Sequence, residues 1–296
     1  LPIWDQWGFS GFVVSDLYAI DGLMSQRVAA GRDEAGILAL RSGVDSDLGG
    51  NCFSADLVRA CREGRLAEAD IDRAVSRILR LKFKMGLFDN PYVKVKKAEK
   101  LIGTSGHREV AREVARQSVV LLKNENQLLP LSKEVKRVAV IGPNAVNVYN
   151  QLGDYTAPQA PGSVITVLEG IRQKLPGAEV CYVKGCAVRD TLDTSIGEAC
   201  ETAKNSDVVV VVLGGSSARD FETDFLETGA AVANERKVSD MESGEGFDRI
   251  GLSLMGKQVE LLKALYATGR PVVLVMVQGR PLELNWAAEH IPAILT

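Results

Sequence analysis

The sequence has few of the residues that mark several large classes of functional site. It contains only two histidines, and its five cysteines show no C-x-x-C spacing, which argues against a zinc site. It has no run of about 18 apolar residues, the length that a membrane-spanning helix requires. Its formal net charge of −3 gives no basic surface for nucleic acid. We therefore expect neither a metal nor a cofactor, and neither a membrane nor a nucleic acid as partner.

Two further signatures are missing. The turn Gly142-Pro143-Asn144-Ala145 follows a predicted strand but lacks the G-x-G-x-x-G pattern of a dinucleotide site, and its proline removes one backbone donor. No serine stands in the nucleophile elbow of a Ser-His-Asp hydrolase. The ordinary interpretation of the five cysteines is that they are buried free thiols; Cys181 and Cys186 could form a disulfide, and the sequence does not decide this.

The two ends of the chain are unusual. Residues 1–4 carry neither a methionine nor a signal peptide, and they lead directly toward a buried strand. Residues 291–296 form an apolar run that stops as if within a strand. We expect a fragment or a processed chain.

Apolar runs alternate with helical patterns in residues 1–90, which we expect to form a first α/β unit. Strands are predicted at 12–16 and 44–50, and helices at 33–42, 54–63 and 68–84. The resulting order, β-α-β-α-α, is too short for a closed eight-stranded barrel, which needs roughly 250 residues. Residues 91–106 are rich in lysine and are predicted to be a solvated linker.

Residues 107–296 are predicted to form a second α/β domain. Helices are expected at 107–117, 166–175, 195–205 and 254–268, and strands at 118–123, 137–141, 179–183, 207–214 and 271–278. Near-continuous Val, Leu and Ile runs between helices indicate a mostly parallel sheet covered on both faces. The segment 214–254 has little periodicity, and long irregular loops of this kind are usually functional or disordered.

Asp16 and Glu245 are the candidate catalytic residues. Asp16 ends the apolar run that begins at Gly11, as an acid does when a buried strand delivers it at its carboxyl end. Glu245 stands between two glycines in the long segment, where another molecule can approach closely. Two carboxylates about 5–5.5 Å apart can cleave a glycosidic bond with retention, one as nucleophile and the other as acid and then base. Two domains are expected to contribute one carboxylate each.

Each of these acids also has an ordinary structural interpretation. Asp16 alone could be a turn acid or a helix N-cap, and Glu245 alone could be a solvent-exposed side chain. The adjacent residues Asp248-Arg249 are predicted to form a local ion pair that orders the loop. Asp45 and Asp47 close the second predicted strand, where they are structural or position a substrate.

At these positions the sequence resembles glycoside hydrolase family 3, of the β-glucosidase and β-xylosidase type. Gly11 to Asp16 is similar to the nucleophile segment of that family, and Ser243 to Gly246, followed by Asp248-Arg249, is similar to its acid/base loop. Further similar segments, in the family's order, are Gln117 to Asn124, Leu128 to Leu131, Val138 to Ala145, Gly153 to Tyr155 and Gly214 to Ser217. The resemblance covers nearly the whole chain.

The resemblance implies a fold and roles for several residues. The fold would be the C-terminal part of a (β/α)8-type barrel followed by an α/β sandwich domain, with Asp16 ending the seventh barrel strand and Asp45 to Gly49 the eighth. Asp16 would be the nucleophile and Glu245 the acid/base. Substrate contacts are expected from Leu17, Tyr18, Asp47 and Ser243. Many β-glucosidases of the family carry tryptophan at position 17, so Leu17 leaves the choice between glucose and xylose open.

The implied activity is that of a retaining exo-β-glycosidase that releases glucose or xylose from a β-linked oligosaccharide or from an aryl or alkyl glycoside. Most of the barrel is absent from the sequence, so we expect the chain alone to be inactive without the missing barrel segment. The alternatives are a non-catalytic carbohydrate-binding or scaffold fragment that needs a partner chain and, less favoured, an N-acetylglucosaminidase. The resemblance favours a periplasmic or extracellular location and leaves a homodimer open.

Overall fold

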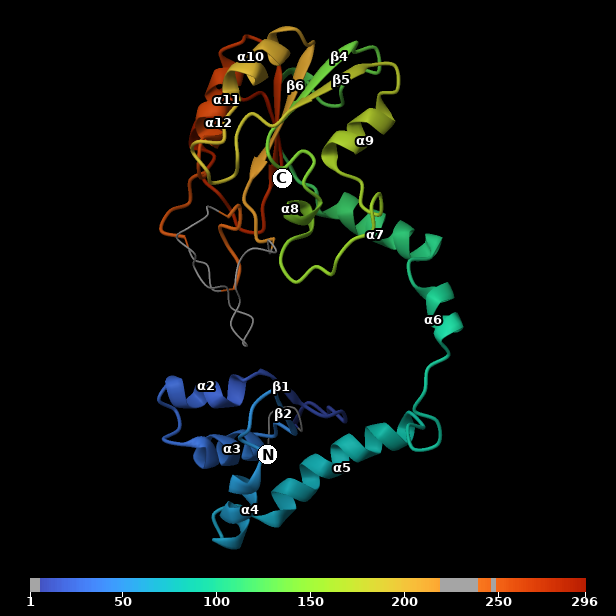
Figure 1. The fold of residues 1–296 in the computed structure, drawn as a ribbon, viewed down its shortest axis with the longest axis vertical. Coiled ribbons are helices and arrows are strands. Elements are labelled where there is room, and N and C mark those ends of the chain that lie inside the picture. The colour runs from blue at the N-terminus through green and yellow to red at the C-terminus, as the bar shows by residue number, and fades with distance from the viewer. Residues whose placement is uncertain (1–5, 219–238, 246–248) are drawn as a thin grey trace. The chain divides into compact units, whose positions relative to one another are not determined.

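The computed structural model describes residues 6–218, 239–245 and 249–296, and Figure 1 shows its elements in chain order. The chain divides into two compact units, Leu1–Ser105 and Gly106–Thr296. Each unit is described by itself below. In the described part of the chain, no helix combines the length and the apolar character needed to cross a membrane.

The first unit contains two short parallel strands, β1 (Val14–Leu17) and β2 (Ser46–Leu48). Its helices are α2 (Ala19–Ser25), α3 (Arg32–Arg41), α4 (Ala55–Arg62), α5 (Glu68–Lys84) and α6 (Val95–Leu101). The sequence pattern misses α2, because this seven-residue helix has no side-chain cap and buries only Ile20. It also misses α6, which lies inside the predicted linker and has no buried residue. The first unit therefore has the order β-α-α-β-α-α before this last helix.

Small residues let the elements of the first unit pack closely. Helix α3 carries Gly36, where an added Cβ would lie 2.5 Å from the carbonyl oxygen of Cys52.

The carboxylate of Asp45 is buried, and it accepts a hydrogen bond of 2.8 Å from the backbone N–H of Val13. Arg77 of α5 lies 3.5 Å from the same carboxylate. Asp45 thus ties α5 and the chain before β1 to the start of β2, which is a structural role.

The second unit is built on a six-stranded sheet with the order β3-β8-β7-β6-β4-β5. The strands are β3 (Leu121–Asn124), β4 (Arg137–Ile141), β5 (Glu179–Val183), β6 (Val208–Gly214), β7 (Val272–Val277) and β8 (Ala293–Leu295). All neighbouring pairs are parallel except β3 with β8. The prediction of a mixed α/β fold with a mostly parallel sheet is therefore confirmed.

Helices cover both faces of this sheet. The helices described between residues 105 and 290 are α7 (Ser105–Ser118), α8 (Val148–Leu152), α9 (Val167–Lys174), α10 (Ile196–Lys204), α11 (Gln258–Tyr266) and α12 (Asn285–His290), and a 3-10 turn lies at Glu125–Gln127. Of these, α7 buries no residue. Figure 1 shows α10, α11 and α12 on one side of the sheet and α9 on the other. The sequence pattern misses α8 and α12 because helices of five and six residues are too short to show a period. The apolar run at 291–296 contains β8.

Strand β6 is buried along its whole length because apolar side chains pack against both faces of the sheet. Val209 and Val211 belong to the core that includes α10 and α11, whereas Val210 and Val212 pack with Leu168 of α9. Burial of each such side chain contributes roughly 1.5–3 kcal/mol. The five cysteines are all free thiols, so Cys181 and Cys186 do not form a disulfide.

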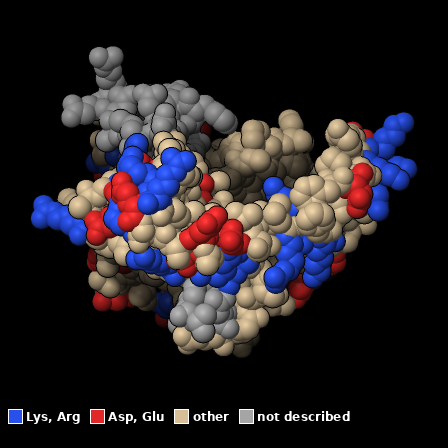
Figure 2. All heavy atoms as spheres, turned by 90° about the horizontal axis from the view of Figure 1, so that it is seen from below, with Lys and Arg blue, Asp and Glu red and all other residues tan. Residues whose placement is uncertain are grey.

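Charges of both signs are interspersed on the face drawn in Figure 2. One exposed acid has a defined role at the amino ends of the strands: Asp207 accepts backbone hydrogen bonds from Lys136 (2.9 Å) and Arg137 (2.8 Å). These bonds, with that from Arg137 the larger cause, lower the pKa of the Asp207 carboxyl. Asp207 therefore fixes the start of β4 beside that of β6.

This lowered pKa gives a pH dependence that Asp207→Asn should remove. Because the folded pKa lies below the unfolded one, the stabilisation is complete above the unfolded value of about 3.8 and is lost as pH falls through the folded value. We expect the variant to melt below the parent protein at pH 7, and the gap to narrow at pH 3. Thermal melts at both pH values test this, and a gap that does not change with pH would contradict it.

Candidate functional site

The segment that carries Glu245 follows the carboxyl end of β6, an edge where open α/β sheets place their binding sites. In its described residues, 215–218 and 239–245, Ser243 is buried and Glu245 is exposed. Gly244 has φ +124°, and an added Cβ there would lie 2.8 Å from the methyl group of Met241. The positive φ therefore favours glycine beside Glu245, and a larger residue would also have to displace the end of the Met241 side chain.

A buried network of amide and hydroxyl groups fixes the backbone from which this segment leaves the sheet. Asn144 donates to the carbonyl of Gly215 (3.1 Å) and accepts from Asn150 of α8 (2.8 Å). Ser216 donates its hydroxyl to Asn150 (2.7 Å). The carbonyl of Ser216 accepts from the N–H of Glu242 (2.9 Å). Hydrogen bonds thus connect Asn144 through Asn150 and Ser216 to Glu242, which stands three residues before Glu245.

Glu242 and Arg249 form a buried ion pair, with side chains only 4% and 8% exposed. Arg249 was expected to pair with Asp248, but residues 246–248 lie outside the described residues. The sequence did not single out Glu242, although it lies in the same glycine-rich segment as Glu245.

A cavity of about 280 Å³ opens beside this segment at the carboxyl edge of the sheet. Its lining includes the polar residues Asn150, Asp154, Ser216, Ser217, Ser243, Gln278 and Arg280. Ser243, which was predicted to bind substrate, is therefore on a polar cavity, whereas Asp154, Gln278 and Arg280 were not predicted. The spacing of the lining residues gives no signal, because they come from four segments that meet only when the sheet forms.

Asp16 lies on β1 and is exposed. Its carboxylate accepts a hydrogen bond of 2.7 Å from the N–H of Leu17, the next residue. The N-cap of α2 is Tyr18, at φ 55°, and not Asp16. The N–H of Tyr18 donates to the carbonyl of Leu48 at 2.9 Å, which holds the end of β1 against β2. The helix-cap interpretation of Asp16 is therefore wrong.

Leu17, Tyr18 and Asp47 gather where β1 and β2 end. An added Cβ at Gly49 would lie 2.3 Å from Leu17 and 3.6 Å from Tyr18, so both side chains pack over the turn that follows β2. Asp47 accepts a hydrogen bond of 2.8 Å from the N–H of Cys52. These predicted substrate-binding residues thus share one edge of the first unit with Asp16.

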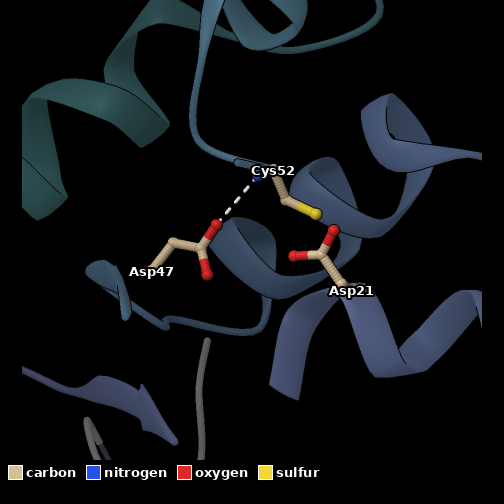
Figure 3. A group of neighbouring side chains, drawn as sticks. All are labelled: Asp21, Asp47 and Cys52. Atoms are coloured by element: carbon tan, nitrogen blue, oxygen red, sulfur yellow. Dashed lines mark hydrogen bonds between the residues drawn. The ribbon is translucent and has the colours of Figure 1, made fainter. Parts of the chain in front are cut away.

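The carboxylates of Asp21 and Asp47 and the sulfur of Cys52 lie within 4.8 Å of one another (Figure 3). This set has the atom types of a metal site. Burial and then the charge of Asp21 raise the pKa of the Cys52 thiol to about 12, so the metal-free thiol is protonated at neutral pH. The backbone N–H of Cys52, and not its thiol, donates the 2.8 Å bond to Asp47.

Comparison with known protein families assigns both units. Residues 119–296 match the model of the glycosyl hydrolase family 3 C-terminal domain, and residues 3–81 match that of the family 3 N-terminal domain. The chain belongs to glycosyl hydrolase family 3. The resemblance inferred from the motifs around Asp16 and Glu245 is therefore confirmed at the level of the family.

The family 3 relatives include enzymes named for two sugars. The chain is 38% identical to a β-xylosidase of Formosa agariphila, over 98% of this chain and 39% of that protein. It is 33% identical to a periplasmic β-glucosidase of Salmonella typhimurium, over 98% of this chain and 38% of that protein. The structure of a β-glucosidase from Erythrobacter marinus matches with a TM-score of 0.79 and 36% identity, over 98% of this chain and 39% of that one. The chain thus spans less than half the length of these relatives.

Proposed function

We propose that this chain carries the two catalytic carboxylates of a retaining exo-β-glycosidase, with Asp16 as nucleophile and Glu245 as acid/base. The observation that most supports this is the setting of Glu245. It is an exposed carboxylate on a glycine-flanked segment whose base is buried and hydrogen bonded, at the carboxyl edge of a parallel sheet. Family 3 membership favours this activity over a non-catalytic carbohydrate-binding fragment.

The proposed reaction has two displacements. Asp16 attacks the anomeric carbon while Glu245 protonates the departing glycosidic oxygen, so that the bond to the aglycone breaks as the bond to Asp16 forms. Glu245, now ionised, then takes a proton from water. The resulting hydroxide attacks the same carbon and releases the sugar and the Asp16 carboxylate. The two inversions give net retention, and the mechanism requires carboxylates about 5–5.5 Å apart in the assembled site.

We infer that the first unit supplies the last two strands of a (β/α)8-type barrel, β1 and β2. Their parallel pairing and the alternation with helices agree with such a barrel segment. The proposed division is 1–90 for the barrel part, 91–106 for a linker that includes α6, and 107–296 for the α/β sandwich domain. The remaining barrel strands would come from a segment that this sequence does not contain.

The proposed substrates end in a β-linked glucose or xylose, the sugars named in the relatives. Leu17, Tyr18 and Asp47 would contact the sugar near Asp16, and Ser243 would contact it near Glu245. The periplasmic relative supports a periplasmic or extracellular location.

Replacing Glu245 with alanine in the full-length protein tests this proposal. General acid catalysis contributes about 10²–10⁴-fold, and a poor leaving group depends on it most. We expect kcat/KM to fall by about that factor on an alkyl β-glycoside and to stay within about threefold on a dinitrophenyl β-glycoside. Azide should restore turnover and give the β-glycosyl azide, because it attacks the intermediate from the face that Glu245 leaves open.

Glu260→Ala is the matched control. Glu260 is an exposed glutamate of α11 whose described ion-pair partner is Lys257 (2.6 Å), and its loss should leave both substrates unaffected. If Glu245→Ala lowers kcat/KM equally on both substrates and azide has no effect, Glu245 is not the acid/base.

A further inference from the structure

We infer that Glu242 is a positioning residue, which holds the segment bearing Glu245 through its buried ion pair with Arg249. This inference rests on the proposed role of Glu245. Glu242 and Arg249 stand three residues before and four residues after that acid, and their side chains are 4% and 8% exposed. The pair therefore joins a residue before Glu245 to a residue after it.

The amino-terminal side of this closure is tied to the sheet. The N–H groups of Glu242 and Ser243 both donate to the carbonyl of Ser216, at 2.9 and 3.3 Å. Arg189 donates to the carbonyl of Met241 at 2.8 Å. The backbone at Glu242 is thus held by hydrogen bonds to two other segments of the chain.

The carboxyl-terminal side depends on Arg249. Its guanidinium pairs with the Glu242 carboxylate and also donates to the carbonyls of Gly251 (3.2 Å) and Ser253. A planar guanidinium can hold several acceptors at once in a fixed geometry. Arg249 therefore links the backbone of residues 251–253 to the carboxylate of Glu242.

The sheet leaves room for this carboxylate only because position 215 is glycine. An added Cβ on Gly215 would lie 1.9 Å from Oε1 of Glu242. Gly215 directly follows β6, so an alanine there would push the carboxylate away from its present place without removing any polar group. This gives a second way to disturb the pair, independent of its charge.

A catalytic acid that is displaced by about 1 Å can lose about 10²-fold in rate. Glu242 touches no reacting atom in the proposed mechanism, so its loss should act only through Glu245. The expected signature is the selectivity of a lost general acid, in which the rate falls for a poor leaving group and is retained for a good one. A general loss of folded protein would lower both rates equally.

The test compares Glu242→Gln and Gly215→Ala in the full-length protein, with alkyl and dinitrophenyl β-glycosides as substrates. We expect kcat/KM to fall by about 10²-fold on the alkyl glycoside and by less than about threefold on the dinitrophenyl glycoside, in both variants. Titration of competent sites with a 2-fluoroglycoside corrects both rates for any misfolded fraction. Glu179→Gln is the control, because it removes an ion pair with Arg137 (3.1 Å) at the amino end of β5.

Equal losses on the two substrates after this correction, or no loss on either, would overturn the positioning role. If Glu242→Gln gives either of these results while Glu245→Ala lowers the rate only for the poor leaving group, the positioning role is wrong. The proposed function is then unaffected. If Glu245→Ala itself shows no selectivity, both proposals fall.

Discussion

Asp16→Ala is expected to reduce the turnover of the full-length protein by about 10⁴-fold or more, the scale on which loss of a nucleophile acts in other enzymes. Without the carboxylate, no covalent intermediate forms, and the remaining acid can only assist a direct attack by water. The structure favours a specific effect, because Asp16 is exposed and its described hydrogen bond joins it to the next residue, Leu17. Initial rates on aryl β-glucosides and β-xylosides measure the loss.

The product formed in azide separates the two carboxylate roles. Azide can occupy the space that the Asp16 side chain leaves, and it then attacks from the α face to give the α-glycosyl azide. The Glu245→Ala variant should give the β-glycosyl azide instead. Asp56→Ala is the control, since that half-buried acid of α4 pairs with the exposed Arg59 (2.6 Å). Turnover of the Asp16 variant within about tenfold of the parent would show that another group is the nucleophile.

Much of the fold could be predicted from local patterns. The run Val208–Leu213 gave β6 because a strand covered on both faces needs apolar side chains at every position. The helix predicted at 68–84 coincides with α5, whose apolar residues repeat at helical spacing. Asp16 and Glu245 stood out for a related reason, since a polar residue at the end of an apolar run and a carboxylate between glycines are visible in the sequence alone.

The supporting groups around Glu245 could not be predicted, because they come together only through the tertiary structure. Ser216 and Asn150 are 66 residues apart and meet because α8 follows β4, the neighbour of β6 in the sheet. The pairing of Arg249 with Glu242 also depends on burial, which local spacing does not encode. Sequence patterns therefore found the candidate catalytic acids but not the contacts that orient them.

Gly214→Ala is expected to destabilise the second unit by about 3–5 kcal/mol. Gly214 has φ +137°, which costs an L-residue about 1–3 kcal/mol, and the added Cβ would lie 1.9 Å from the carbonyl oxygen of Val277. Overpacking of this kind adds about 1–3 kcal/mol. Moving Gly214 would also disturb its two 2.9 Å hydrogen bonds with the buried side chain of Gln258.

Urea unfolding of the chain, followed by the fluorescence of Trp286 in the second unit, measures this loss. The control is Gly197→Ala in α10, where an added Cβ meets no atom within 4 Å and alanine should stabilise the helix by up to about 1 kcal/mol. Equal unfolding midpoints for the two variants would contradict the prediction. Since Gly214 ends β6 and Gly215 begins the chain toward Glu242, the backbone geometry that stabilises the sheet is also the geometry that directs the Glu245 segment out of it.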